Sequence, residues 1–321
     1  MRRMQIEVVD LPLARPFAIA RGTRTSVSVV RVTLEEAGII GLSECTPTLR
    51  YGETAESVCA QLALLKEAVC HGLQREELQH ILPAGSARNA LDCALWRLQA
   101  GRQGQDLWQS LQQVSPRKIV TAETLSLDST ANMIAAAEDA VSRGAVLLKI
   151  KLDQENILQK VAGVRSVAPE STLVIDANES WENQELPSLF TALADYRIAM
   201  VEQPLPAGRD DILRTFHAPF PVCADESCHT AEDIARLADR YQMINIKLDK
   251  CGGLTEALNM VSTARELQMR IMVGCMLGSS LAMEAALPVA TAAEFVDLDG
   301  PVWLAGDSSP FLSYSRGHIW L

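Results

Sequence analysis

The chain has 321 residues, of which 48% are hydrophobic and 21% charged, and its formal net charge is −11. This length is sufficient for one large α/β barrel or for two domains with a sizeable core. The acidic residues are scattered and no basic stripe is present, so nucleic acid is not an expected partner. No apolar run reaches the roughly 18 residues of a membrane span, and the first residues contain no signal-peptide core, so we expect a cytoplasmic protein that does not bind membranes.

The eight cysteines include no C-x-x-C pair and lie mostly in apolar segments. This pattern argues against a zinc knuckle and against a disulfide framework. We therefore expect most of the cysteines to be small buried hydrophobic residues in a reducing compartment.

Residues 1–115 are predicted to form a small α+β domain. Three segments rich in valine and isoleucine predict an antiparallel meander of strands at residues 4–10, 27–34 and 39–43. Apolar residues at helical spacing then predict two helices, at residues 54–71 and 87–100. The segment between the first two strands, residues 15–24, carries three arginines and is predicted to be a mobile surface loop.

From Lys118 onwards, strand-like segments alternate with helical patterns. The strand-like segments are residues 119–123, 145–152, 172–176, 198–202, 221–225, 243–247, 270–275 and 294–297. Eight consecutive parallel strands joined by helices predict a closed α/β barrel, with its site at the carboxyl ends of the strands. We assign residues 116–300 to this barrel. Residues 301–321 have too few strand or helix signals for a ninth unit and are predicted to return to the first domain.

Two lysines mark the end of the second barrel strand. Lys149 and Lys151 are two residues apart, so on a strand they share one face. A fully packed interior would tolerate neither charge. This strand end is therefore predicted to lie at an open, hydrated end of the barrel.

Three carboxylates end three successive strands: Asp176, Glu202 and Asp225. In a barrel they would be neighbours around one rim. Without histidine or cysteine, such a set is suited to Mg²⁺, or to Mn²⁺, with water or substrate completing the coordination. Any one of the three could simply cap the following helix. At matching places in three units, however, they predict a metal site.

Lysines lie on either side of this triad along the rim, with Lys247 at the far side from Lys149 and Lys151. A divalent cation close to a partly desolvated lysine favours its neutral form, so each lysine is a candidate general base. Two bases on opposite sides of one carbon, together with a metal, suit a reaction that begins with proton abstraction next to a carboxylate or carbonyl.

Five motifs in order resemble the muconate-lactonising subgroup of the enolase superfamily. They are Lys-Ile-Lys at 149–151, Asp-Ala-Asn at 176–178, Val-Glu-Gln-Pro at 201–204, Ala-Asp-Glu-Ser at 224–227 and Asn-Ile-Lys-Leu-Asp-Lys-Cys-Gly-Gly at 245–253. The resemblance covers the full chain. It implies an N-terminal capping domain, a modified (β/α)₇β barrel and a C-terminal return to the cap.

The resemblance also implies roles for the rim residues. Mg²⁺ would be bound by Asp176, Glu202 and Asp225. Lys151 and Lys247 would face each other across the α-carbon of the substrate, and an enolate would form between them. Lys149 would help to polarise the substrate carboxylate.

Asp297 and Asp299 end the eighth strand and, by the period-two rule, face one side. At the rim, two carboxylates form a receptor for a cation, most simply a substrate ammonium, although a plain turn pair is the alternative. This Asp-x-Asp resembles the dipeptide epimerases of the subgroup, where the pair holds the N-terminal amine of the dipeptide.

Other positions of that family point to an acidic dipeptide. An arginine of the loop between the first two strands can meet an acidic side chain there, and Arg24 matches better than Arg21. Thr124 and Cys275 occupy positions expected to touch the dipeptide backbone, although a serine is expected in place of the cysteine. Together these features resemble the L-Ala-D/L-Glu epimerases of murein-peptide recycling.

Three other interpretations stay open. A cycloisomerase or lyase of the subgroup, acting in muconate lactonisation or o-succinylbenzoate synthesis, would keep the metal and the lysines but would not need Asp297 and Asp299. A metal-binding scaffold without turnover would not need the acid-base lysines. Residues 274–280 could cradle a phosphate, but no lysine or arginine lies next to them. The sequence leaves open the oligomeric state, including a homo-oligomer.

Overall fold

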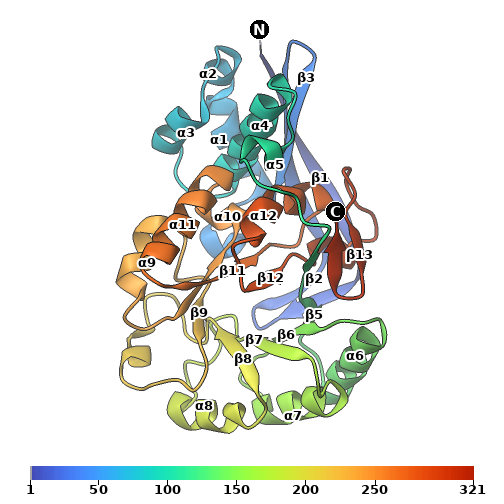
Figure 1. Ribbon diagram of the computed structural model, residues 1–321, viewed down its shortest axis with the longest axis vertical. Coiled ribbons are helices and arrows are strands. Elements are labelled where there is room, and N and C mark those ends of the chain that lie inside the picture. Colours follow the sequence, from blue (N-terminus) through green and yellow to red (C-terminus); the bar gives the residue numbers. More distant parts are fainter. Residues whose placement is uncertain (1) are drawn as a thin grey trace.

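The computed structural model describes residues 2–321, and Figure 1 shows a barrel of parallel strands with a smaller sheet-and-helix domain at one end. The barrel strands pair in sequence order: β5 (Glu123–Leu125), β6 (Leu147–Lys151), β7 (Thr172–Asp176), β8 (Ile198–Glu202), β9 (Val222–Ala224), β10 (Met243–Ile246), β11 (Arg270–Gly274) and β12 (Phe295–Asp297). A hydrogen bond from Ala122 N to Val296 O (2.7 Å) brings the first and last strands together. The predicted (β/α)₇β barrel is confirmed.

Helices surround the barrel: α6 (Thr130–Ser142), α7 (Ile157–Val167), α8 (Leu186–Ala194), α9 (Ala231–Leu237), α10 (Leu248–Cys251), α11 (Leu254–Glu266) and α12 (Ser280–Ala290). Between β8 and β9, where the alternation of strands and helices predicts a helix, the chain forms only a 3₁₀ turn, η2 (Asp211–Arg214). Pro219 and Pro221 follow closely and favour extended backbone before them, which limits helix growth. Within residues 2–321, no helix is both long enough and apolar enough to cross a membrane.

The interior of the barrel is apolar at one end and polar at the other. Side chains two apart on β6 share the inward face, so Leu147 belongs to the apolar interior while Lys149 and Lys151 follow it towards the carboxyl end. The same change occurs on β7, where Val174 is followed by Asp176. Period-two alternation thus gathers the charged side chains at one rim.

The strand predicted over residues 119–123 is divided between two sheets. Its first part, β4 (Lys118–Val120), pairs antiparallel with β14 (His318–Trp320), which also pairs with β13 (Ser313–Ser315). The barrel strand β5 begins only at Glu123. The prediction of one continuous strand was wrong, because the first half of this segment pairs with β14 and not with the barrel strands.

The C-terminal tail begins with the 3₁₀ turn η3 (Gly300–Trp303) and makes two kinds of contact. Ala305 N donates to Pro12 O (2.8 Å) and Arg31 Nη2 donates to Ser308 Oγ (2.7 Å), so this part meets the N-terminal domain. The strands β13 and β14 instead join β4. The division into residues 1–115, 116–300 and 301–321 stays a prediction.

The N-terminal domain, called the cap below, is an antiparallel sheet of β1 (Arg3–Ile19), β2 (Gly22–Glu36) and β3 (Ile39–Cys45) covered by helices. The helical segments are η1 (Leu49–Tyr51), α1 (Ala55–Leu64), α2 (Lys66–Cys70), α3 (Arg75–Ile81), α4 (Ser86–Arg102) and α5 (Leu107–Ser110). The single helix predicted over residues 54–71 is thus two helices. A Cβ at Gly41 would lie 2.1 Å from Ala94 O, so glycine allows α4 to pack closely on β3.

The predicted loop over residues 15–24 is instead the end of a long hairpin, called the cap hairpin below. Phe17 pairs with Arg24 and Ile19 pairs with Gly22, and a register shift separates these pairs from the rest of the β1–β2 ladder. The loop prediction was wrong because an exposed two-stranded ribbon accepts polar side chains on both faces. Ala18 N donates to Ser126 Oγ (2.8 Å), so the cap hairpin reaches the barrel rim.

Candidate active site

A cavity of about 480 Å³ lies between the cap hairpin and the carboxyl ends of the barrel strands. Eight residues singled out from the sequence line it: Arg21, Arg24, Thr124, Lys151, Lys247, Cys275, Asp297 and Asp299. They come from both the cap and the barrel, and the fold brings them around one space. The cavity is therefore the candidate active site.

The three rim carboxylates are fully buried beneath this cavity. Asp176 pairs with Glu202 in the ladder, and Glu202 pairs with Cys223, two residues before Asp225. Each carboxylate binds at least one ammonium group. Lys151 Nζ lies 2.5 Å from Asp176 Oδ2, and Lys247 Nζ lies 2.7 Å from Asp225 Oδ2.

The three carboxylates differ in their acidity. Burial favours the neutral form of each, but Lys151 and Lys149 outweigh it and hold the pKa of Asp176 below its ordinary value. Lys247 and Lys250 likewise lower the pKa of Asp225. For Glu202, burial and the charge of Asp176 raise the pKa to about 7. The group is thus a dense cluster of charge in which Glu202 is the weakest acid.

The donor set of this cluster fits a hard divalent cation, because every candidate ligand atom is a carboxylate oxygen. Glu202 Oε2 and Asp225 Oδ1 accept no well-aligned hydrogen bond, although ammonium groups lie within ion-pair distance of them. Within residues 2–321, no three such side chains are arranged to hold a metal ion as they stand. The carboxylates turn towards lysines, so a cation bound here would compete with ammonium groups for the same oxygens.

The ammonium groups of the three rim lysines have different surroundings: that of Lys149 is enclosed in the protein, while Lys151 and Lys247 line the cavity. Lys151 lies on β6 and Lys247 directly follows β10, four strands further round an eight-stranded barrel, so they approach the cavity from opposite sides. Lys149 does not line the cavity. It is completely buried, and its Nζ lies 2.7 Å from both Asp297 Oδ2 and Glu202 Oε2.

Neighbouring carboxylates of the protein favour the charged forms of Lys247 and Lys149. Burial lowers the pKa of Lys247, but Asp225 and Glu202 outweigh this effect and raise the pKa above its ordinary value. In the same way, Asp297 and Glu202 raise the pKa of Lys149. A neutral lysine near pH 7 therefore requires another positive charge among the same carboxylates.

Asp297 and Asp299 both line the cavity, next to Thr124. Thr124 N donates to Asp299 Oδ2 (2.7 Å), while Thr124 Oγ1 lies 3.4 Å from Asp297 Oδ1. Burial and the neighbouring Asp297 raise the pKa of Asp299 to about 7. A cation placed beside this pair would lower that pKa. Cys275 lines the same cavity, and burial raises the pKa of its thiol.

Arg24 and Arg21, the two candidates from the sequence, have different surroundings. Both line the cavity. Within residues 2–321, Arg24 makes no ion pair, whereas Arg21 binds Glu179 and Glu226 through its Nη1 atom, at 3.1 and 2.8 Å. Of these two arginines, Arg24 is therefore the one whose guanidinium has no carboxylate partner among the described residues.

Two family profiles together match most of the chain. The profile described as "Enolase C-terminal domain-like" matches residues 132–309. The profile described as "Mandelate racemase / muconate lactonizing enzyme, N-terminal domain" matches residues 2–111. The chain belongs to the mandelate racemase/muconate lactonizing enzyme family of the enolase superfamily.

Relatives within this family are racemases and epimerases. The L-Ala-D/L-Glu epimerase of Escherichia coli (strain K12) is 48% identical over 321 residues, which is 100% of both chains. The N-acetyl-D-glutamate racemase of Pseudoalteromonas sp is 39% identical over 293 residues, 91% of this chain and 92% of the relative. The resemblance to dipeptide epimerases that the sequence motifs indicate is confirmed.

A solved structure supports the same relationship. The dipeptide epimerase from Cytophaga hutchinsonii, complexed with Mg and the dipeptide D-Ala-L-Val, superimposes with a TM-score of 0.92. It is 27% identical, and the match covers 100% of this chain and 93% of that one.

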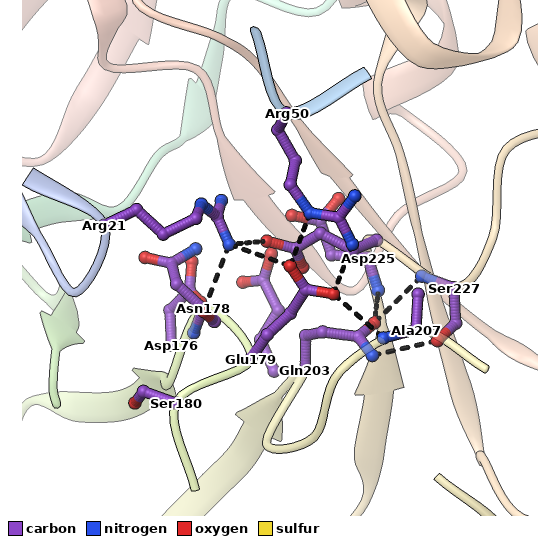
Figure 2. A network of polar contacts seen from close by, with 12 residues as sticks. Arg21, Arg50, Asp176, Asn178, Glu179, Ser180, Gln203, Ala207, Asp225 and Ser227 are labelled. Carbon is purple, nitrogen blue, oxygen red and sulfur yellow. Dashed lines mark hydrogen bonds and ion pairs between the residues drawn. The ribbon is translucent and has the colours of Figure 1, made fainter. Parts of the chain in front are cut away.

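Next to the cavity lies a polar network around Glu179 that was not predicted from the sequence, although Arg21, one of its members, was a candidate. Figure 2 shows Arg21 and Arg50, from two segments of the cap, pointing towards Glu179 on the turn that follows β7. Glu226 directly follows the predicted ligand Asp225 within the motif at 224–227, so the sequence did indicate that Glu226 lies near the site. Arg50 and Glu179 have no such signal, because their pairing depends on how the cap meets the barrel.

Proposed function

We propose that this protein is an isomerase that inverts the α-carbon of the C-terminal residue of a dipeptide, with L-Ala-D/L-Glu as its substrate. The observation that carries this proposal is the pair Lys151 and Lys247 on opposite sides of one cavity, above three buried carboxylates. The 48% identical relative, which is an L-Ala-D/L-Glu epimerase, supports it. Such an enzyme acts in the cytoplasmic recycling of murein peptides.

The two lysines perform the proton transfers. Lys151 and Lys247 each act on one face of the α-carbon, so that one removes its proton and the other returns a proton to the opposite face. The direction reverses for the other epimer. A lysine that holds the abstracted proton as ammonium can exchange it with solvent, so inversion introduces a solvent proton at the α-carbon.

Asp176, Glu202 and Asp225 would hold the Mg²⁺ ion, which is the metal of the Cytophaga hutchinsonii relative. When bound, the ion supplies positive charge that stabilises the negative charge developing on the substrate carboxylate and favours neutral lysines. Lys149, whose Nζ lies 2.7 Å from both Glu202 Oε2 and Asp297 Oδ2, places a positive charge beneath the cavity and would help to polarise the substrate carboxylate.

Two further contacts select the substrate. Asp297 and Asp299, which line the cavity beside Thr124, would bind the N-terminal ammonium of the dipeptide. Arg24 would bind the side-chain carboxylate of its second residue. The Pseudoalteromonas relative acts on an N-acetylated substrate. An N-acetyl group carries no positive charge, so the buried aspartate pair favours a dipeptide over such a substrate.

The proposed function is tested by α-deuteration in D₂O with Mg²⁺, followed by NMR. L-Ala-L-Glu is expected to exchange its glutamyl α-proton and to epimerise faster than L-Ala-L-Leu or N-acetyl-D-glutamate. Deuteration of none of the dipeptides would contradict the proposal and favour a cycloisomerase or lyase. Preference for N-acetyl-D-glutamate would contradict the assignment of Asp297 and Asp299 to an ammonium group.

Arg24→Met is expected to weaken the use of L-Ala-L-Glu selectively. Losing a charge-assisted contact with a carboxylate costs about 1.5–3 kcal/mol, which corresponds to a KM roughly 10- to 100-fold higher. The KM for L-Ala-L-Leu should change much less, as steady-state kinetics can show. Arg15→Met is the matched control, because Arg15 lies over the ring of Trp303 and is not part of the cavity wall. Equal losses on both dipeptides in Arg24→Met would refute the role of Arg24.

A further inference from the structure

Glu179 joins two separate segments of the cap to the barrel. Its carboxylate accepts from Arg50 at both oxygens, with Nε and Nη2 each 2.6 Å away, and from Arg21 Nη1 at 3.1 Å. The backbone N–H of Ala207 donates to the same carboxylate (2.8 Å). Figure 2 shows both arginines converging on this one side chain. Glu179 is therefore the centre of a network between the domains.

The backbone at this turn is held in an unusual conformation. Asn178 and Glu179 have φ angles of 43° and 70°, in the left-handed region that side chains other than glycine rarely adopt. Such backbone persists only where surrounding contacts hold it. The turn also reaches the rim carboxylates, because Asn178 N donates to Asp176 Oδ1 (2.9 Å).

Arg21 binds this turn and a second loop of the barrel through a single nitrogen. Its Nη1 atom donates to Asn178 O (3.1 Å) and lies 2.8 Å from Glu226 Oε1 on the loop after β9. Arg21 lies in the turn of the cap hairpin, three residues before Arg24. One strand of the hairpin has its own anchor at Ala18 and Ser126, so Arg21 adds a second anchor at the turn.

The burial of these groups distinguishes the network from an ordinary surface ion pair. Exposed ion pairs contribute little to stability because water screens them. Here the carboxylate side chains are 9% exposed for Glu179 and 1% exposed for Glu226, so the charges interact in a partly desolvated site. Although burial favours the neutral form, Arg50 and the Ala207 N–H lower the pKa of Glu179, which keeps it ionised.

We propose that Arg21 and Glu179 form an ionic latch that fixes the turn of the cap hairpin above the cavity and thereby positions Arg24. Both are positioning residues, because they act through Arg24 rather than on the substrate. The effect of the latch on substrate preference rests on the proposed function, whereas the anchoring of the cap hairpin does not depend on it.

Limited trypsin digestion tests the hairpin directly, with cleavage at the Arg24–Thr25 bond followed by mass spectrometry. Arg21→Met removes all three contacts of the guanidinium and should speed this cleavage by about tenfold or more, because a protease cuts backbone that has left its paired state. Arg21→Lys keeps one positive nitrogen and should restore protection. Glu182→Gln is the matched control, since Glu182 lies on the same barrel loop but pairs with Arg209 instead of the cap.

Kinetics with L-Ala-L-Glu test the positioning of Arg24. Arg21→Met should raise KM about tenfold while kcat changes by less than about threefold, and Arg21→Lys should recover most of the loss. In an Arg24→Met background, Arg21→Met should add almost nothing, because the residue that the latch positions is already absent. Glu179→Gln provides a second variant of nearly unchanged shape, with the same direction of effect.

Two outcomes would overturn the latch. Wild-type cleavage at Arg24–Thr25 in both Arg21→Met and Glu179→Gln would show that the hairpin does not depend on these contacts. The second outcome is a loss of kcat in Arg21→Met that multiplies with the loss from Arg24→Met in the double variant. It would show that Arg21 and Glu179 act on the rim carboxylates and not through Arg24. If the wild-type protein does not epimerise L-Ala-L-Glu, the proposed function fails, and the digestion still decides the latch.

Discussion

Lys151→Ala and Lys247→Ala are each expected to abolish net epimerisation of L-Ala-Glu. The two lysines reach the cavity from strands on opposite sides of the barrel, so in the proposed reaction each would serve one face of the α-carbon. A proton removed from one face cannot be delivered to the other when either lysine is missing. Loss of a general acid or base typically lowers the rate by roughly 10²- to 10⁴-fold, and inversion needs both lysines. Chiral chromatography of the reaction products measures the loss.

Exchange with solvent should nevertheless survive in each variant. The remaining lysine can still remove the α-proton of the one epimer that presents it, exchange that proton with D₂O and return deuterium to the same face. The two variants should therefore deuterate opposite epimers of L-Ala-Glu without inversion, as NMR can follow. Inversion in either variant, or exchange of the same epimer by both, would rule out the two-base assignment and favour a lyase.

Glu202→Gln is expected to abolish both activity and the response to Mg²⁺. The substitution removes one charge from the three rim carboxylates but changes little volume, so the fold should persist. Because charge stabilisation by a metal is worth several kcal/mol, we expect activity to fall about a thousandfold or more. Chelation of divalent ions should have the same effect on the wild-type protein, and added Mg²⁺ should reverse it.

Thermal unfolding provides a readout of the same site that does not need turnover. A ligand that binds only the folded state raises Tm, so Mg²⁺ should stabilise the wild-type protein and leave Glu202→Gln unchanged. Glu294→Gln is the matched control, since Glu294 pairs with Arg270 at the opposite end of the barrel. Full activity after chelation, or an unchanged Mg²⁺ shift in Glu202→Gln, would refute the assignment of the metal to this site.

Much of the barrel and its rim could be predicted because their signals are local. Each strand carries its own period-two pattern, in which an apolar inward side chain such as Val174 is followed two residues later by a polar one such as Asp176. Parallel strands place their carboxyl ends together, so the pattern also predicts that these polar ends meet. The placement of Lys151, Lys247 and Asp297 around one cavity follows from this logic.

Errors occurred where a segment is completed by a distant part of the chain. Residues 118–120 have the composition of a barrel strand, yet they pair with β14 near the C-terminus. Residues 15–24 carry the polar composition of a loop, yet they pair with each other as a hairpin that rests on the barrel. Local composition cannot reveal a pairing that depends on which backbone edge is available nearby.

The sequence by itself determined the strand order, the position of the charged rim and the chemical types gathered there. Only the tertiary structure decided which of those charges face the cavity. Lys149 and Lys151 lie two residues apart on the same face of β6, but the first is buried among carboxylates and the second reaches the cavity. Arg21 and Arg24 differ by three residues, yet Glu179, 158 residues away from Arg21, engages only the first of them within residues 2–321. Burial and ion pairing depend on contacts between distant segments, and the folded chain alone brings those segments together.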